Sequence, residues 1–127
     1  MIVVDTSALL AIVKDEPKAL ACIEAMKKAD RVLISAGTLA ETLIVAERKD
    51  VWTTTSEFLA GLDLEVVPVD EEAARWAATG YSLWGKGVHP ANLNFGDCFS
   101  FALAKSLNCP LLFIGNDFSQ TDIVSAI

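Results

Sequence analysis

The chain has 127 residues, enough for one domain with a hydrophobic core of its own. Seventeen acidic residues against ten basic ones give a net charge of −7, which excludes nucleic-acid binding through a generally basic surface. Three cysteines without paired spacing and a single histidine exclude a disulfide framework and a His-rich metal site. No apolar run approaches the roughly 20 residues of a membrane span. We therefore expect a cytoplasmic protein without a membrane anchor.

The first predicted element is a short strand over the apolar run Met1 to Val4, which ends at Asp5. Its β-branched residues do not alternate with polar ones, a pattern typical of a parallel strand buried on both faces. Asp5 then lies at the carboxyl end of the strand, where open α/β sheets place their ligand-binding crevices. Asp5 can also cap the helix predicted from Ala8 to Lys14, and taken alone its position favours the cap.

Helix and strand patterns alternate along the rest of the chain. Helices are predicted over Pro17–Ala29, Ala36–Lys49, Trp52–Leu62 (capped by Thr53, Thr54 or Thr55), Asp70–Leu83 and Cys98–Leu107. Strands are predicted over Arg31–Ser35, Leu64–Val69 and Pro110–Ile114, with a last short one possible in Asp122–Ile127. The alternation predicts one α/β domain over residues 1–127, with three α/β/α layers around a mainly parallel sheet.

Four carboxylates are predicted to meet at one rim of this sheet. Asp5 and Asp117 follow strands, Glu41 lies in the first turns of a helix, and Asp97 opens another helix. The three aspartates can each be explained as helix caps or turn residues. Glu41 cannot, because the apolar residues three and four positions further on share its helical stripe and indicate partial burial. An unpaired charge there is costly, so Glu41 needs a cationic partner.

No lysine or arginine is placed to neutralise four acids together, whereas a bound divalent cation would do so. Oxygen ligands without His or Cys favour Mg²⁺ or Mn²⁺ over Zn²⁺. Such an ion at an open crevice suits phosphodiester hydrolysis, because it activates water and neutralises charge on the leaving oxygen. The ion also converts an acidic rim into an acceptor for phosphate.

Five stretches, taken in chain order, carry a family resemblance: Val4–Leu9, the helix around Glu41, Gly85–Ala91, Leu93–Cys98 and Gly115–Ile123. Together they resemble the PIN-domain nucleases, and most closely the VapC-type toxins of toxin–antitoxin modules. The resemblance implies a PIN-like fold over residues 1–127. It also implies a Mg²⁺-dependent endoribonuclease that is dimeric and is silenced by a small VapB-like antitoxin in the active-site groove.

The resemblance also implies roles for individual residues. By position, the catalytic acids would be Asp5, Glu41, Asp97 and Asp117, with Asp5, Asp97 and Asp117 as metal ligands. The hydroxyl of Ser7, or that of Thr6, would assist beside Asp5.

Lys86, which lies between two glycines, is the candidate for a phosphate contact, with an ordinary solvated loop lysine as the equal alternative. His89 is more typical of a loop residue than of a catalytic base.

Three other classes of function compete with this interpretation. A haloacid-dehalogenase-like phosphatase also begins with a strand ending in Asp, but it needs a second acid where this chain has Ser7. A receiver-like regulator needs a lysine after a late strand, where this chain has Gly115. A catalytically silent acid-pocket interaction module would lack one of the acids, and none of the four is missing.

The apolar content, 53% of the residues, exceeds what a small core is expected to cover. We expect the excess between Ala36 and Leu62, whose apolar side chains cannot all face one sheet. This predicts a homodimer through these helices or the ones just before them. An antitoxin would then fill a groove beside the acidic rim and present a basic side chain to the carboxylates.

Overall fold

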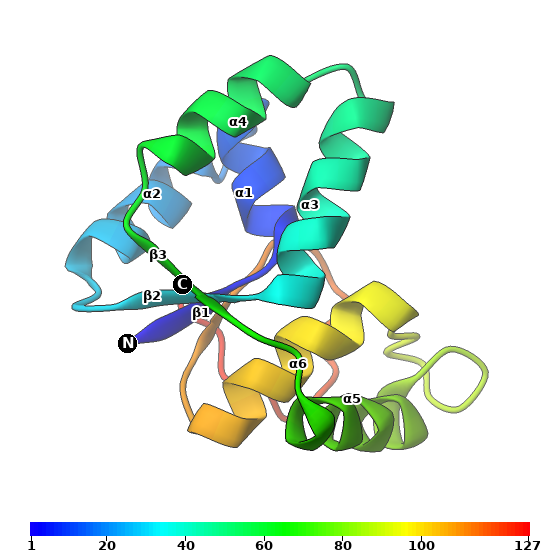
Figure 1. Ribbon diagram of the computed structural model, residues 1–127. Helices are drawn as coiled ribbons and strands as arrows, with labels where there is room; N and C mark the ends of the chain where they lie inside the picture. The colour runs from blue at the N-terminus through cyan, green and yellow to red at the C-terminus, as the bar shows by residue number, and fades with distance from the viewer.

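The computed structural model describes residues 1–127 and has six helices around a four-stranded sheet (Figure 1). In chain order the elements are β1 (Ile2–Val4), α1 (Thr6–Val13), α2 (Ala19–Lys28), β2 (Val32–Ser35), α3 (Ala36–Arg48), α4 (Trp52–Ala60), β3 (Leu64–Val67), α5 (Glu71–Trp84), α6 (Phe95–Leu107) and β4 (Leu111–Leu112). The strand order is β3-β2-β1-β4, and all three neighbouring pairs are parallel. None of the helices is both long and apolar enough to cross a membrane.

Both faces of the sheet are covered by apolar side chains. Alternate strand residues point to opposite faces and pack into two separate hydrophobic cores. One core contains α6 side chains such as Phe101 together with the strand residues Val3, Leu33 and Leu111. The other contains side chains of α1 and α2 together with the strand residues Ile2, Val4, Ile34 and Leu112. Figure 1 shows α1, α2 and α4 on one side of the sheet and α5 and α6 on the other. The predicted three-layer α/β/α architecture is therefore confirmed.

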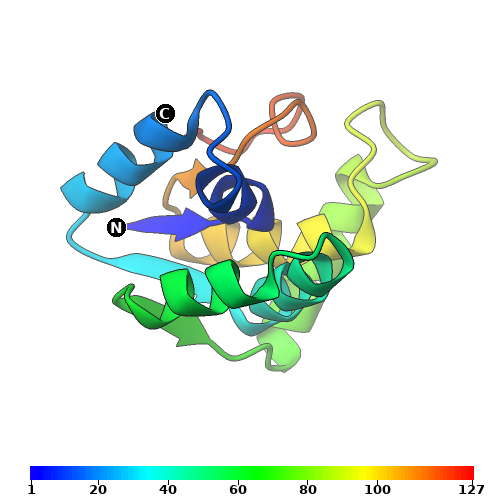
Figure 2. The ribbon, with the colours of Figure 1, turned by 90° about the horizontal axis from the view of Figure 1, so that it is seen from above.

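The path of the chain across the sheet reverses at β1. The chain runs outward from β1 to β2 and β3 and then returns to the opposite side of β1 as β4. Figure 2 shows β1 (blue) between β2 (cyan) and β4 (orange). In open α/β sheets the crevice outside the carboxyl ends of the strands at such a reversal is where ligands bind. Asp5 follows β1 directly, so the topology places Asp5 at that crevice.

Several local features differ from the sequence predictions. Helix α2 begins two residues after Pro17, with no side-chain cap. Helix α4 also lacks a side-chain cap, so the prediction of a threonine cap is wrong. The hydroxyl of Thr55 instead donates to the carbonyl of Val51 at 2.7 Å, on the buried face of the helix. The predicted last strand is reduced to one bridge between Leu111 and Ser125.

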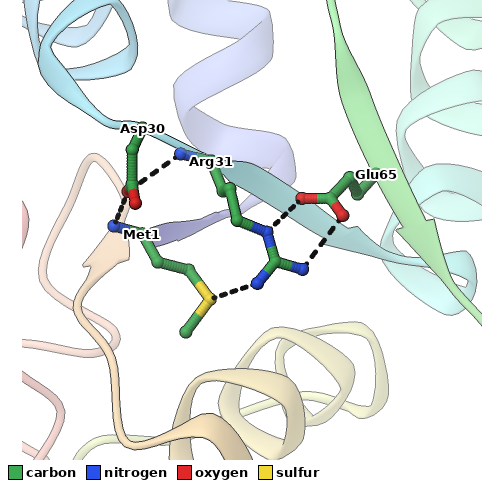
Figure 3. Close-up of polar contacts among 4 residues, drawn as sticks. All are labelled: Met1, Asp30, Arg31 and Glu65. Carbon is green, nitrogen blue, oxygen red and sulfur yellow. Dashed lines mark hydrogen bonds and ion pairs between the residues drawn. The ribbon is translucent and has the colours of Figure 1, made fainter.

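Ion pairs close the amino-terminal edge of the sheet (Figure 3). The N-terminal ammonium of Met1 lies 2.6 Å from Oδ1 of Asp30. Arg31 donates from Nε and Nη2 to the two carboxylate oxygens of Glu65, at 2.8 and 3.0 Å. The first pair joins the start of β1 to the residues just before β2, and the second joins those residues to β3. Both lie at the end of the strands that is opposite Asp5. They are solvent-exposed, so they contribute little to stability.

Candidate active site

Asp5 is buried and is held on both carboxylate oxygens. Its side chain is only 4% exposed. Oδ2 accepts hydrogen bonds from the N–H of Ser7 at 3.0 Å and from the hydroxyl of Ser7 at 2.7 Å. The first bond caps α1, which therefore begins at Thr6, two residues earlier than predicted. Oδ1 accepts a hydrogen bond from the hydroxyl of Ser100 at 2.6 Å. Asp5 thus caps α1 and also lies at the crevice beyond β1.

Asp97 is buried in the first turn of α6. Its backbone N–H donates to the Asn94 side chain at 2.9 Å, while its Oδ2 accepts from the N–H of Asn94 at 3.0 Å. This capping box starts α6 three residues earlier than predicted. Burial raises the pKa of Asp97 to about 7, and the charges of the other three predicted acids add to the rise. Asp97 is therefore a carboxylate whose charge is costly until a cation neutralises it.

Glu41 reaches the same region from α3. Burial raises the pKa of its carboxyl, the neighbouring Thr6 side chain lowers it, and the charge of Asp5 raises it further. The Glu41 carboxylate lies against the backbone of Gly96, where an added β-carbon would overlap its Oε2. Asp117 lies in the turn after β4 and is exposed. The structure thus brings Asp5, Glu41 and Asp97 together in one partly buried group, with Asp117 at its exposed side.

Gly96→Ala is expected to displace the Glu41 carboxylate, because the new methyl group would occupy its space. The flexible glutamate side chain can move, so the fold should survive while the nuclease activity that the sequence predicts should fall. Circular dichroism and a cleavage assay measure the two effects. Gly61→Ala is the matched control, since a β-carbon there would meet its nearest atoms at an ordinary 3.6 Å. Equal activity of Gly96→Ala and the control would show that the position of Glu41 is unimportant.

The four acids fit a hard divalent cation by their chemistry. The five ion pairs of the structure all involve other acids, so no basic side chain neutralises this group. Every ligand that the group offers is an oxygen, as Mg²⁺ and Mn²⁺ prefer. No three His, Cys, Asp or Glu side chains surround one point closely enough to hold an ion as they stand. The carboxylates would have to close on a cation, and the assignment of its ligands stays a prediction.

The hydroxyl of Ser7 is already engaged in contacts with the protein. It donates to Asp5 and accepts the backbone N–H of Ile114 at 3.0 Å, just beyond β4. The Ser7 hydroxyl therefore contacts an acid of the site, as expected beside Asp5. The predicted contact of Ser7 with the substrate stays a prediction.

Lys86 and His89 lie in the loop between α5 and α6, which projects from the body of the molecule (Figure 1). Lys86 is exposed and forms no ion pair with any of the four acids, so its predicted phosphate contact stays a prediction. Nδ1 of His89 accepts the N–H of Ala91 at 3.0 Å, and its ring packs edge-on against Trp84. These contacts give His89 a structural role within the loop.

Buried hydroxyls beneath the acids were missed by the sequence analysis. Three of these side chains have no exposed surface: Thr38, Thr42 and Ser100. The hydroxyls of Thr38 and Ser100 lie 3.0 Å apart, and those of Thr6 and Thr42 lie 2.9 Å apart. Helical spacing was the available signal, because Thr38 and Ser100 lie three residues from Glu41 and Asp97 in sequence.

A large groove lies away from the acids. It has a volume of about 710 Å³ and runs between α2 and α4, beside the amino-terminal ends of β2 and β3. Its apolar lining includes Ile23, Met26, Phe58 and Leu62. This groove is separate from the one predicted beside the acidic rim, which stays a prediction.

Comparison with known proteins defines the family of this chain. Residues 2–124 match the sequence model of the PIN domain, and the chain belongs to the PIN-domain family. Its relatives there are VapC ribonucleases. Ribonuclease VapC28 of Mycobacterium tuberculosis is 41% identical, over 98% of this chain and 97% of that protein. Ribonuclease VapC30 of the same organism is 43% identical, over 97% of this chain and 96% of that protein.

Solved structures share the fold of this chain. VapC20 of Mycobacterium tuberculosis, described as a sarcin–ricin loop cleaving toxin, superposes with a TM-score of 0.79 at 19% identity, over 98% of this chain and 97% of that one. VapBC-5 of the same organism, a member of the VapBC family of toxin–antitoxin systems, superposes with a TM-score of 0.64 at 26% identity, over 98% and 92%. The predicted PIN fold is thereby confirmed.

Proposed function

We propose that the chain is a divalent-metal-dependent endoribonuclease toxin that hydrolyses RNA phosphodiester bonds and is neutralised by a cognate VapB-like antitoxin. One observation carries the proposal: two buried carboxylates, Asp5 and Asp97, share the crevice at the end of β1 without a basic partner. The 41–43% identity to VapC ribonucleases supports RNA as the substrate. A silent interaction module or a haloacid-dehalogenase-like phosphatase has no comparable support.

The proposal gives each acid a task. Asp5, Asp97 and Asp117 would hold Mg²⁺ or Mn²⁺, which when bound supplies an activated water and neutralises charge on the phosphate. Asp5 is the fixed ligand, because three hydrogen bonds orient its carboxylate. Asp97 keeps Oδ1 free of these cap bonds, since only Oδ2 accepts the N–H of Asn94. Glu41, whose pKa is raised, is suited to accept a proton from the attacking water.

RNA cleavage should therefore require added metal. The purified chain, freed of antitoxin, is treated with EDTA and assayed on labelled RNA with and without Mg²⁺ or Mn²⁺. We expect no cleavage in EDTA and recovery with either ion. His89→Ala should behave like the wild type, because the imidazole nitrogen contacts only its own loop. Cleavage that resists EDTA, or that is lost in a folded His89→Ala variant, would refute the proposed roles.

An antitoxin is proposed as the partner that silences the site. The structural neighbour VapBC-5 is a toxin–antitoxin pair, and unpaired carboxylates suit a bidentate arginine from such a partner. The arginine would replace the cation, so antitoxin affinity should fall as Mg²⁺ rises. Affinity that is independent of Mg²⁺ would refute this competition.

A homodimer is proposed as well, on a narrower basis than the sequence suggested. Between Ala36 and Leu62, side chains such as Leu39 and Phe58 pack on the core. Ile44 and Trp52 are 57% and 46% exposed and are the apolar side chains left for a partner. Light scattering that shows a monomer at micromolar concentration would overturn the dimer.

A further inference from the structure

Ser100 makes the contact from which this inference starts. It lies on α6, one helical turn after Asp97, and its side chain is fully buried. Its hydroxyl donates to Oδ1 of Asp5 at 2.6 Å. An ionised carboxylate only accepts, so the single hydrogen of the Ser100 hydroxyl is committed to Asp5.

The direction of the next hydrogen bond follows from the first. Oγ1 of Thr38 lies 3.0 Å from Oγ of Ser100, and Ser100 has no second hydrogen to donate. Thr38 must therefore donate to Ser100, which in turn donates to Asp5. Two O–H donors in series polarise each other, which strengthens the bond that reaches the carboxylate.

This relay joins the elements that carry the acids. Thr38 lies three residues before Glu41 on α3, and Ser100 lies three residues after Asp97 on α6. A second relay reaches the other oxygen of Asp5 from the backbone N–H of Ile114 through Ser7. Oδ1 of Asp5 is thus fixed from the helices of Glu41 and Asp97, and Oδ2 is fixed by Ser7, which itself accepts a bond from the segment of Asp117.

We propose that Ser100 is a positioning residue, which, oriented by Thr38, holds the Asp5 carboxylate in the direction that binds the divalent cation. This inference rests on the proposed function. A hydrogen bond to a metal ligand fixes its orientation, and losing such a bond typically costs about 10–100-fold in metal affinity. Neither hydroxyl needs to touch the cation or the RNA.

The test is direct Mn²⁺ binding, followed by electron paramagnetic resonance of the free ion, without any RNA. Ser100→Ala should weaken Mn²⁺ binding about 10-fold or more. Thr38→Val, which keeps the side-chain shape, should weaken it less but in the same direction. The double variant should equal Ser100→Ala, because Thr38 acts only through Ser100. Ser106→Ala is the matched control, an exposed serine of α6 that bonds only to its own helix.

Several outcomes would overturn the inference. Wild-type Mn²⁺ affinity in folded Ser100→Ala would show that the bond to Asp5 does not position it. If Ser100→Ala fails to fold, wild-type affinity in Thr38→Val would overturn the inference in its place. If the loss of Mn²⁺ affinity in the double variant equals the product of the losses in the two single variants, Thr38 does not act through Ser100 and the relay is refuted. Absence of Mn²⁺ binding by the wild type would instead refute the proposed function, and this inference with it.

Discussion

Asp97→Asn is expected to abolish RNA cleavage and to make the metal-free protein more stable at neutral pH. Cleavage should be lost because an amide does not supply the negative charge that a divalent cation needs. The capping box should survive, since the new amide oxygen can accept the N–H of Asn94 as Oδ2 does now. The gain in stability follows from removing a carboxylate whose pKa is raised to about 7 by burial and by three neighbouring acids.

The pH dependence of this effect has a definite sign. The unfolded carboxyl has a pKa of about 3.9, so between about pH 4 and pH 7 the folded state holds a proton that the unfolded state has released. The contribution of Asp97 to the free energy of unfolding therefore falls as pH rises through this window and is constant above it. The total fall should amount to a few kcal/mol.

Urea unfolding of both proteins in EDTA at pH 5, 6, 7 and 8 measures the difference. The free energy of unfolding of Asp97→Asn should rise relative to that of the wild type at each step up to about pH 7. Saturating Mg²⁺ should make the wild type the more stable of the two. Parallel pH profiles for the two proteins, or cleavage by the variant, would contradict the account.

Asp5→Asn is expected to abolish cleavage too, but with the opposite effect on stability. The carboxylate accepts three hydrogen bonds, two from Ser7 and one from Ser100. An amide has one oxygen and turns its NH₂ group toward one of these donors. At least one buried donor then loses its acceptor, at a cost of about 1–3 kcal/mol. The cap of α1 should persist, because Asn is as good an N-cap as Asp.

Thermal unfolding of the two asparagine variants side by side, in EDTA at pH 7.5, separates the two kinds of acid. Asp5→Asn should melt below the wild type and Asp97→Asn above it, while neither cleaves RNA. An equal shift of both variants in the same direction would mean that the hydrogen bonds to Asp5 do not determine its contribution.

The sheet and the acids were predictable because the signals for them are local. The unalternating run from Met1 to Val4 predicted a strand buried on both faces, and the structure places β1 between β2 and β4 with both faces covered. Asp5 was found because it follows that run directly. The start of α6 was predicted three residues too late, because the capping-box spacing of Asn94 and Asp97 was not recognised in the sequence.

The partial burial of Glu41 was predicted for the wrong reason. The stripe inferred from its apolar neighbours contains Ile44, which is 57% exposed. The buried stripe of α3 is instead formed by Thr38, Thr42 and Ala46. Two of these residues are polar, so hydrophobic periodicity could not identify the face that packs inward.

The hydroxyl relay could not be predicted from the sequence. Thr38 and Ser100 are 62 residues apart, and their contact depends on how α3 and α6 meet at the end of β1. Taken alone, each is a common residue in a helix. Their role becomes visible only when burial shows that each hydroxyl needs a partner.

The chemical form of the RNA ends tests the central claim most directly. If the acids and a divalent cation deliver water to phosphorus, the cut leaves a linear phosphate on one fragment and a hydroxyl on the other. An RNA with a single 2′-deoxy substitution at the cleaved position should then be cut as well. We predict linear phosphate ends, seen by mass spectrometry, and cleavage of the 2′-deoxy RNA. A 2′,3′-cyclic phosphate, or a 2′-deoxy RNA that resists cleavage, would contradict the account.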